Sequence, residues 1–176
     1  QEGLRTWYDY QENFAGHIDG DGHVVYGLYH YTKGTIDSFI AYATYGKKGA
    51  GLIPLVNTDD TVTITNMGID CAYVRHQYSA GAFIGSGATS TITNCFVGEN
   101  VKVEGKDIGA FIGRNYAKKF TLQNCYSLAT VYGNSKSLYG LVGQFYQTTA
   151  TMKNCYNANG PLTSYSSPNY STVYKF

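Results

Sequence analysis

The 176-residue sequence has little proline, almost no net charge and no long apolar run. Its 13 Lys and Arg against 12 Asp and Glu give a formal net charge of +1, so nothing predicts a nucleic-acid partner. No apolar run reaches the roughly 18 residues from which a membrane-spanning helix is recognised. The repeated part of the sequence, residues 61–156, lacks the spacing of an amphipathic helix. These absences argue against a helical fold, against a membrane-spanning segment and against a nucleic-acid partner.

Glycine and tyrosine are abundant instead, with 21 Gly and 18 Tyr against 3 Pro. Glycine and β-branched residues weaken helices, whereas β-branched and aromatic residues favour strands. The composition therefore predicts short strands and tight turns in one domain of ordinary size. No signal peptide is recognisable, and a start at Gln1 is what we expect of a mature or trimmed product.

One pattern is repeated between Thr61 and Tyr156. Each copy opens with Thr, an apolar residue, a polar residue and Asn, at residues 63–66, 91–94, 121–124 and 151–154. Glycine-bounded apolar boxes follow the first three copies, at residues 81–85, 109–113 and 140–143. In each of these copies the Asn lies 19 residues before the closing glycine, and successive Asn residues are 28, 30 and 30 apart. A period of this length is the signature of a repeat architecture.

A unit of this size buries its apolar side chains only by stacking on its neighbours. Stacked coils place like residues above one another in parallel strands about 4.8 Å apart. We therefore predict an all-β fold, a parallel β-helix of five to six coils with irregular terminal caps. The expected inward rows are Ile64, Ile92, Leu122 and Met152; Tyr73, Val101 and Val131; and either Phe83, Phe111 and Leu141 or the adjacent Ile84, Ile112 and Val142.

Two segments, Ile92–Gly113 and Leu122–Gly143, closely resemble the GLUG repeat, named for its glycine-leucine-variable-glycine core. Residues 14–29 resemble the segment that leads into such repeats, so the resemblance covers about residues 14–156. The first copies depart from the motif, with Pro54 at a box glycine and Met67 at the Cys position, and the first box lacks its usual partner strand. The family occurs in bacterial surface and secreted proteins.

The GLUG resemblance implies a right-handed β-helix on the exterior of a bacterium, as one module of a longer adhesin-like protein. It implies no catalytic residues and no cofactor. The expected partner is a protein or glycan of a host or neighbouring cell, or a second copy of the chain. The competing functions are a carbohydrate-binding module of a polysaccharide-degrading system and, less favoured, a β-helix polysaccharide lyase or hydrolase.

The repeat divides the chain into four parts. Residues 1–13 are expected to be an N-terminal cap or a trimmed upstream coil, and residues 14–60 the coils that lead into the repeat. Residues 61–156 are expected to be the regular coils, and residues 157–176 a C-terminal cap or linker.

An asparagine row is expected where each first strand ends, at Asn66, Asn94, Asn124 and Asn154. Asn tolerates left-handed backbone, and its amide bonds to backbone groups at a bend. Stacked amides also bond to each other from coil to coil. We interpret the row as a structural corner ladder rather than a binding site.

A cysteine row follows directly, at Cys95, Cys125 and Cys155, with Cys71 out of register. Stacking brings neighbouring Cα atoms within the range of a disulfide, but parallel side chains do not supply its dihedral angle. Nor do parallel side chains converge on a metal ion. We expect buried free thiols; one disulfide or a metal site are the alternatives.

The next position carries an aromatic row, Phe96, Tyr126 and Tyr156, which we expect on the outer face. Outward rings can dock a sugar or a protein. The alternative is that tyrosine is simply a good strand residue on a half-wet sheet. This row is the candidate binding site.

The acidic residues offer little chemistry. Asp19 and Asp21 resemble part of a calcium loop, but Leu28 stands where its bidentate Glu belongs, so a structural turn is preferred. Catalysis on a β-helix needs two or three clustered carboxylates, or a carboxylate with Lys or Arg. The acids of the repeat do not align between coils, and we expect no enzymatic activity; they are Asp70, Glu99, Glu104 and Asp107.

Overall fold

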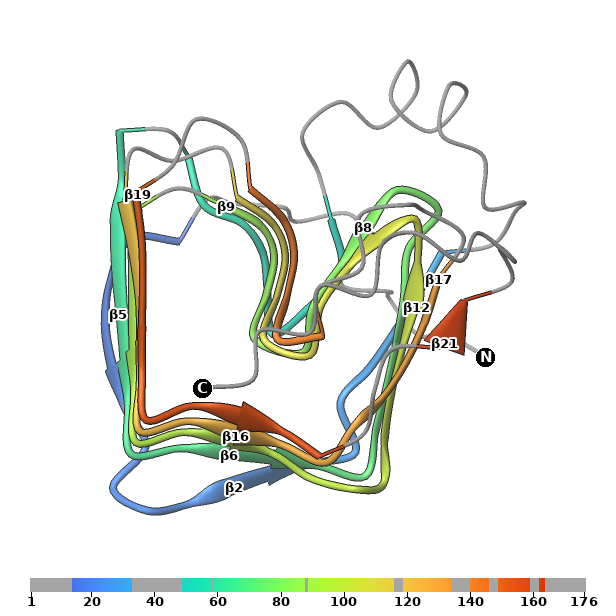
Figure 1. Cartoon of the computed structure of the whole chain (residues 1–176), viewed down its shortest axis with the longest axis horizontal. Helices are drawn as coiled ribbons and strands as arrows, with labels where there is room; N and C mark the ends of the chain where they lie inside the picture. The colour runs from blue at the N-terminus through green and yellow to red at the C-terminus, as the bar shows by residue number, and fades with distance from the viewer. Residues whose placement is uncertain are drawn as a thin grey trace, which may run out of the picture.

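The computed structural model is an all-β solenoid of stacked coils with parallel sheets (Figure 1). It describes residues 14–32, 49–57, 59–87, 89–115, 119–133, 140–145, 149–158 and 162–163. Within these ranges there is no helix, and hence none that could cross a membrane. The predicted β-solenoid is confirmed.

Three five-stranded sheets form the outer sides of the solenoid (Figure 1). Sheet A contains β1 (Gly16–Asp19), β5 (Thr61–Thr65), β10 (Thr89–Thr93), β15 (Lys119–Gln123) and β19 (Thr149–Lys153). Sheet B contains β2 (Val24–Tyr26), β6 (Gly68–Asp70), β11 (Phe96–Val97), β16 (Tyr126–Ser127) and β20 (Tyr156–Asn157). Sheet C contains β3 (Tyr29–Tyr31), β7 (Ala72–Arg75), β12 (Val101–Gly105), β17 (Thr130–Gly133) and β21 (Leu162–Thr163).

The fourth side is folded inwards. Figure 1 shows β8 and β9 running towards the middle of the molecule, between β12 and β5. Sheet D contains β8 (Ser79–Ala80) and β13 (Asp107–Ile108). Sheet E contains β4 (Ile53–Leu55), β9 (Ile84–Gly87), β14 (Ile112–Asn115) and β18 (Val142–Phe145). Pro54 is tolerated in β4 because that strand is the edge of sheet E.

The glycine boxes allow this inward fold. A Cβ added to Gly113 would lie 2.5 Å from the Gly85 carbonyl oxygen and 2.6 Å from the Ala80 nitrogen. A Cβ added to Gly81 would meet the Gly113 nitrogen at 2.6 Å. The backbones of sheets D and E therefore approach so closely that no side chain fits at these box positions.

The number of coils is smaller than the five to six expected. Three regular coils, beginning at β5, β10 and β15, follow a longer first turn and precede a partial last turn. The expectation was too high because β1 to β4 supply only one strand each to sheets A, B, C and E. Residues 1–13, the proposed N-terminal cap, and residues 33–48, which belong to the segment leading into the repeat, lie outside the described residues.

The first predicted inward row is confirmed. Ile64 pairs in register with Ile92, and Ile92 with Leu122, and all three side chains are fully buried. Ile18 and Met152 extend the row to both ends, where they are half-buried. The alternating Thr residues of these strands point outwards.

Both candidate rows at the glycine boxes are buried. Phe83 and Phe111 are fully buried and stack with ring centroids 5.3 Å apart, while Ile84 and Ile112 are equally buried. Strand alternation does not force a choice, because each Phe lies in the bend before its strand. Sheet E is also covered on both faces, since it is folded into the interior.

The predicted inward row Tyr73, Val101 and Val131 is wrong in its register and in Tyr73, although Val101 and Val131 are buried as expected. Val101 pairs with Ala72, and Tyr73 pairs with Lys102 and points outwards. The buried partner of Val131 is Val103. Counting seven positions from each Asn failed because the turns between sheets B and C differ in length from coil to coil.

Candidate functional site

The asparagine row forms a continuous side-chain ladder along the corner between sheets A and B. All four Asn residues have left-handed backbone, with φ between 52° and 55°. Nδ2 of Asn94 donates to Oδ1 of Asn66 at 3.0 Å, Asn124 donates to Asn94 at 2.9 Å, and Asn154 donates to Asn124 at 3.0 Å. The amides are exposed or half-buried and hydrogen-bond to each other, so the ladder stabilises the corner and does not form a binding pocket.

Asp19 is the first member of this ladder. Its Oδ1 accepts from Nδ2 of Asn66 at 3.1 Å and from the backbone N–H of Asp21 at 3.0 Å. Both hydrogen bonds lower the pKa of the Asp19 carboxyl, and the bond from the Asp21 backbone has the larger effect. Asp21 lies in the following turn with φ 48°. Within the described ranges, no group of three or more His, Cys, Asp or Glu side chains is arranged to hold a metal ion.

The cysteine row lies just inside the ladder. Cys95 and Cys125 are buried, Cys155 is half-buried, and all carry free thiols, as does the exposed Cys71. Each sulfur of the row donates to the carbonyl two residues earlier, at 3.2 Å. The Cys155 thiol lowers the pKa of Cys125, but contact with Cys95 and burial outweigh this and raise it to about 11. The Cys125 thiol is therefore protonated and weakly nucleophilic at neutral pH, whereas its hydrogen bond with Cys95 lowers the pKa of Cys95.

The aromatic row Phe96, Tyr126 and Tyr156 stacks ring on ring over sheet B. Successive centroids are 5.4 Å apart with interplanar angles of 8°. The Phe96 ring also lies over Gly68, where an added Cβ would meet the ring at 2.3 Å. Ring faces that cover each other are not available to a sugar, so the row presents edges, and Tyr156, 57% exposed, is its accessible member.

A second aromatic cluster, absent from the predicted sites, occupies the outer face of sheet C. Tyr29, Tyr31 and Tyr73 have ring centroids 5.9 to 6.3 Å apart. Tyr29 is 67% exposed and Tyr31 39%. We call these three residues the tyrosine face. Tyr29 and Tyr31 also stack on each other, with an interplanar angle of 20°, and Tyr29 is the most exposed ring of the face.

Charged side chains border the tyrosine face. The Arg75 guanidinium lies over the Tyr31 ring, 5.1 Å from its centroid, and donates to the Thr32 carbonyl. The Lys102 ammonium lies 5.5 Å from the Tyr73 centroid and 3.4 Å from the Glu104 carboxylate. The Tyr73 hydroxyl donates to Glu104, and partial burial together with this contact raises the pKa of Tyr73 to about 12.

The sequence does contain the signal for this face. Tyr29-His30-Tyr31, Tyr73-Val74-Arg75 and Lys102-Val103-Glu104 each alternate an outward polar or aromatic residue with a buried one. Register counted from the Asn row concealed it, because Tyr73 was assigned to the core.

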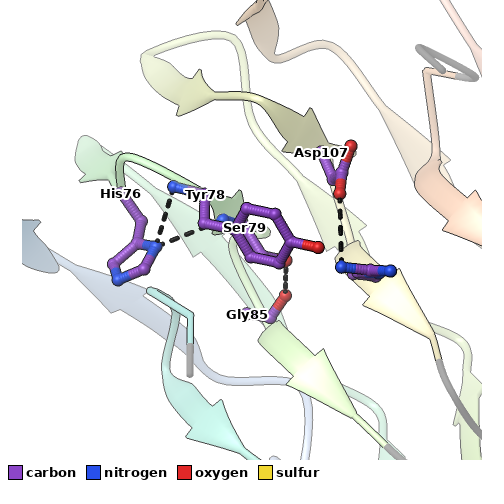
Figure 2. Close-up of polar contacts among 6 residues, drawn as sticks. His76, Tyr78, Ser79, Gly85 and Asp107 are labelled. Carbon is purple, nitrogen blue, oxygen red and sulfur yellow. Dashed lines mark hydrogen bonds and ion pairs between the residues drawn. The ribbon is translucent and has the colours of Figure 1, made fainter. Parts of the chain in front are cut away.

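The main cluster of buried charge joins sheets D and E. Arg114 of β14 lies 3.8 Å from the Asp107 carboxylate of β13 and stacks over the Tyr78 ring, 4.9 Å from its centroid. Figure 2 shows Ser79 beside Gly85, to whose carbonyl its hydroxyl donates at 2.5 Å. Asp107 is 1% exposed and Arg114 8%. The ion pair is therefore out of reach of a substrate in solvent, and its role is to stabilise the packing of sheets D and E.

His76 adds a neutral imidazole to this region. Its Nδ1 accepts from the backbone N–H groups of Tyr78 and Ser79, both at 3.1 Å (Figure 2). Burial, then the neighbouring His30 and Arg75, lowers the pKa of His76 to about 3. The histidine is thus a structural acceptor at neutral pH.

No protein-family model, curated protein or solved structure matches the chain. The functional argument therefore rests on the surfaces described above.

Proposed function

We propose that this chain is a non-catalytic adhesion or assembly module, secreted by a bacterium or held at its surface. It acts through the outer faces or ends of the solenoid, on a protein or glycan of a host or neighbouring cell, or on another copy of itself. One observation carries the proposal: the exposed large hydrophobic side chains of the described ranges are all tyrosines of sheets B and C, namely Tyr26, Tyr29, Tyr31 and Tyr156. Exposed aromatic side chains grouped on a polar surface are typical of interaction sites.

The resemblance to GLUG repeats supports the same proposal and adds an extracellular location. In this chain the box glycines serve the close approach of sheets D and E, a structural role. The buried Asp107–Arg114 pair likewise serves the fold. Binding at outer faces fits this distribution better than catalysis in a groove.

A second candidate is a carbohydrate-binding module of a polysaccharide-degrading system. It is favoured by the tyrosine face, where exposed rings lie beside Arg75, Lys102 and Glu104. The two candidates differ in biological setting rather than in the kind of surface used.

An adhesion assay with fluorescently labelled protein tests the proposal. We expect saturable binding to bacterial or host cells, or concentration-dependent self-association by light scattering. Either property should weaken in the Tyr29→Ala/Tyr31→Ala or the Tyr126→Ala/Tyr156→Ala variant but persist in Thr91→Ala/Thr121→Ala on sheet A. A protein that binds no cell, no glycan and no copy of itself would overturn the proposal. Release of reducing sugar or unsaturated uronate from a polysaccharide would replace it with a catalytic function.

A further inference from the structure

The strands that carry the tyrosine face are held in register against the core. Tyr29 pairs with Tyr73 and Tyr31 with Arg75 across β3 and β7, and Glu104 pairs with Arg75 across β7 and β12. The inward residues between them, His30, Val74 and Val103, are buried and fix the strands against the core. A tyrosine side chain has few rotatable bonds, so rings carried on fixed strands lose little conformational freedom on binding, which favours affinity.

The chemistry of the face suits a sugar chain. One face of a pyranose ring presents C–H groups with partial positive charge, and these are attracted to the negative face of an aromatic ring. Tyr29 and Tyr31 offer rings that are 67% and 39% exposed. Hydroxyl groups both donate and accept hydrogen bonds, and the border of the face supplies both partners, since Arg75 and Lys102 donate and Glu104 accepts.

The same features disfavour other ligands. The core of a protein interface is depleted of Lys and Glu, whereas Lys102 and Glu104 lie directly beside the rings of this face. A polyanion would meet the Glu104 carboxylate beside Lys102, 3.4 Å away. A neutral or weakly charged chain avoids this conflict.

We propose that the outer face of β3, β7 and β12 is a carbohydrate-binding platform. A sugar ring stacks on the exposed Tyr29 ring and contacts the exposed part of Tyr31, and the hydroxyl groups of the sugar chain bond to Arg75, Lys102 and Glu104. The inference rests on the proposed binding function and assigns to it a ligand class and a site, on sheet C rather than along the Phe96, Tyr126 and Tyr156 row.

The test is a glycan and polysaccharide array followed by isothermal titration with the best-bound soluble oligosaccharide. Tyr29→Ala/Tyr31→Ala should weaken binding by tenfold or more. Tyr29→Phe/Tyr31→Phe keeps the ring faces and should stay within about threefold of the wild type, a difference of less than 1 kcal/mol. Thr91→Ala/Thr121→Ala is the control, because it changes two residues of sheet A that belong to neither aromatic surface, and it should change the affinity less than twofold. Unchanged melting temperatures would show that the variants are folded.

Four results would overturn the inference. Glycan binding lost in Tyr156→Ala and kept in the β3 variant would move the site to sheet B. Self-association abolished by the β3 variant would make the face an interface between copies. Attachment to cells through a protein, with no glycan bound, would leave the adhesion proposal intact and remove only the ligand class. If the protein bound no cell, glycan or copy of itself, both proposals would fail.

Discussion

At the scale of single residues, each ladder asparagine has two roles, one in the backbone and one in its side chain. Each adopts left-handed backbone, and each amide bonds to the next coil. Asn124→Ala removes both contributions, whereas Asn124→Gly keeps the backbone conformation and removes only the amide. We expect a loss of unfolding free energy of about 2–3 kcal/mol for Ala and about 1 kcal/mol for Gly.

Chemical denaturation of the two Asn124 variants measures the difference. If alanine and glycine cost the same, the backbone conformation contributes nothing. If alanine is neutral, the ladder is not stabilising. The ladder amides are exposed or half-buried, so their removal leaves no fully buried polar group unpaired. The expected losses therefore come from backbone strain and from the lost side-chain hydrogen bonds between asparagines.

His76 predicts a dependence of stability on pH. Its folded-state pKa is lowered to about 3, while the unfolded chain titrates at about 6.5. Between these values the unfolded state binds a proton that the folded state does not, so the unfolding free energy falls as the pH falls. The buried His30, whose pKa is also lowered by burial, acts in the same direction.

A His76→Asn variant keeps an acceptor for the backbone N–H groups but does not titrate. Urea unfolding at neutral pH and at about pH 4.5 should therefore show a smaller loss for the variant, by about 2 kcal/mol or less. An equal loss in both proteins would show that other groups control acid sensitivity. The stability of the variant at neutral pH serves as its own reference.

At the scale of elements, the inward fold of sheets D and E depends on the box glycines. Gly113→Ala places a Cβ against backbone atoms of Gly85 and Ala80 that have no room to move. We expect the unfolding free energy to fall by about 3 kcal/mol or more, because the added methyl group can be accommodated only by moving the backbone of a neighbouring coil.

Gly27→Ala is the contrasting variant for this effect. Gly27 has φ 75° but nothing within 4 Å of its added Cβ, so only backbone strain of about 1–2 kcal/mol is expected. Melting temperatures compare the two directly. A Gly113→Ala protein as stable as Gly27→Ala would contradict the close approach of the two sheets.

The cysteine row predicts graded reactivity along one side of the solenoid. In the folded protein, alkylation should modify Cys71 first, Cys155 more slowly and the buried Cys95 and Cys125 last, because reaction requires an exposed thiolate. Intact mass after denaturing alkylation should show four labels. Two or fewer labels would mean that the row is oxidised.

At the scale of the whole molecule, the repeat predicted the stacked β fold and one of its buried rows. It did not predict every surface of the solenoid. The fixed spacing of Asn94 and Asn124 was enough to place Ile92 on Leu122. It did not reveal the tyrosine face, because turn lengths after sheet B vary, and nothing in the spacing indicated that the fourth side folds inwards. Those features depend on packing between sheets, which a periodic pattern does not encode.

In-register stacking also predicts that a whole coil is removable. Deleting residues 94–123 joins Thr93 to Asn124 and lets Asn124 take the place of Asn94 against Asn66. Repeat stability is roughly a sum of unit and neighbour contributions, so the shortened protein should keep a β-type circular dichroism spectrum and melt at a lower temperature. Deleting residues 94–118 instead breaks the register and should give unfolded or aggregated protein; equal behaviour of the two deletions would contradict the stacking.

The asparagine ladder has a direction, and this direction determines at which end further repeat units could be added. Every amide donates towards the N-terminal neighbour, so the side-chain dipoles are aligned, and the carboxylate of Asp19 lies at the end to which their N–H groups point. A carboxylate has no proton to pass on, so Asp19 terminates the row as a stop residue. Asn154 is different, because its oxygen would accept the amide of one more coil. Gene duplication that adds units after Asn154 would therefore extend the hydrogen-bonded row without a break, whereas a unit added before Asp19 would begin a separate one.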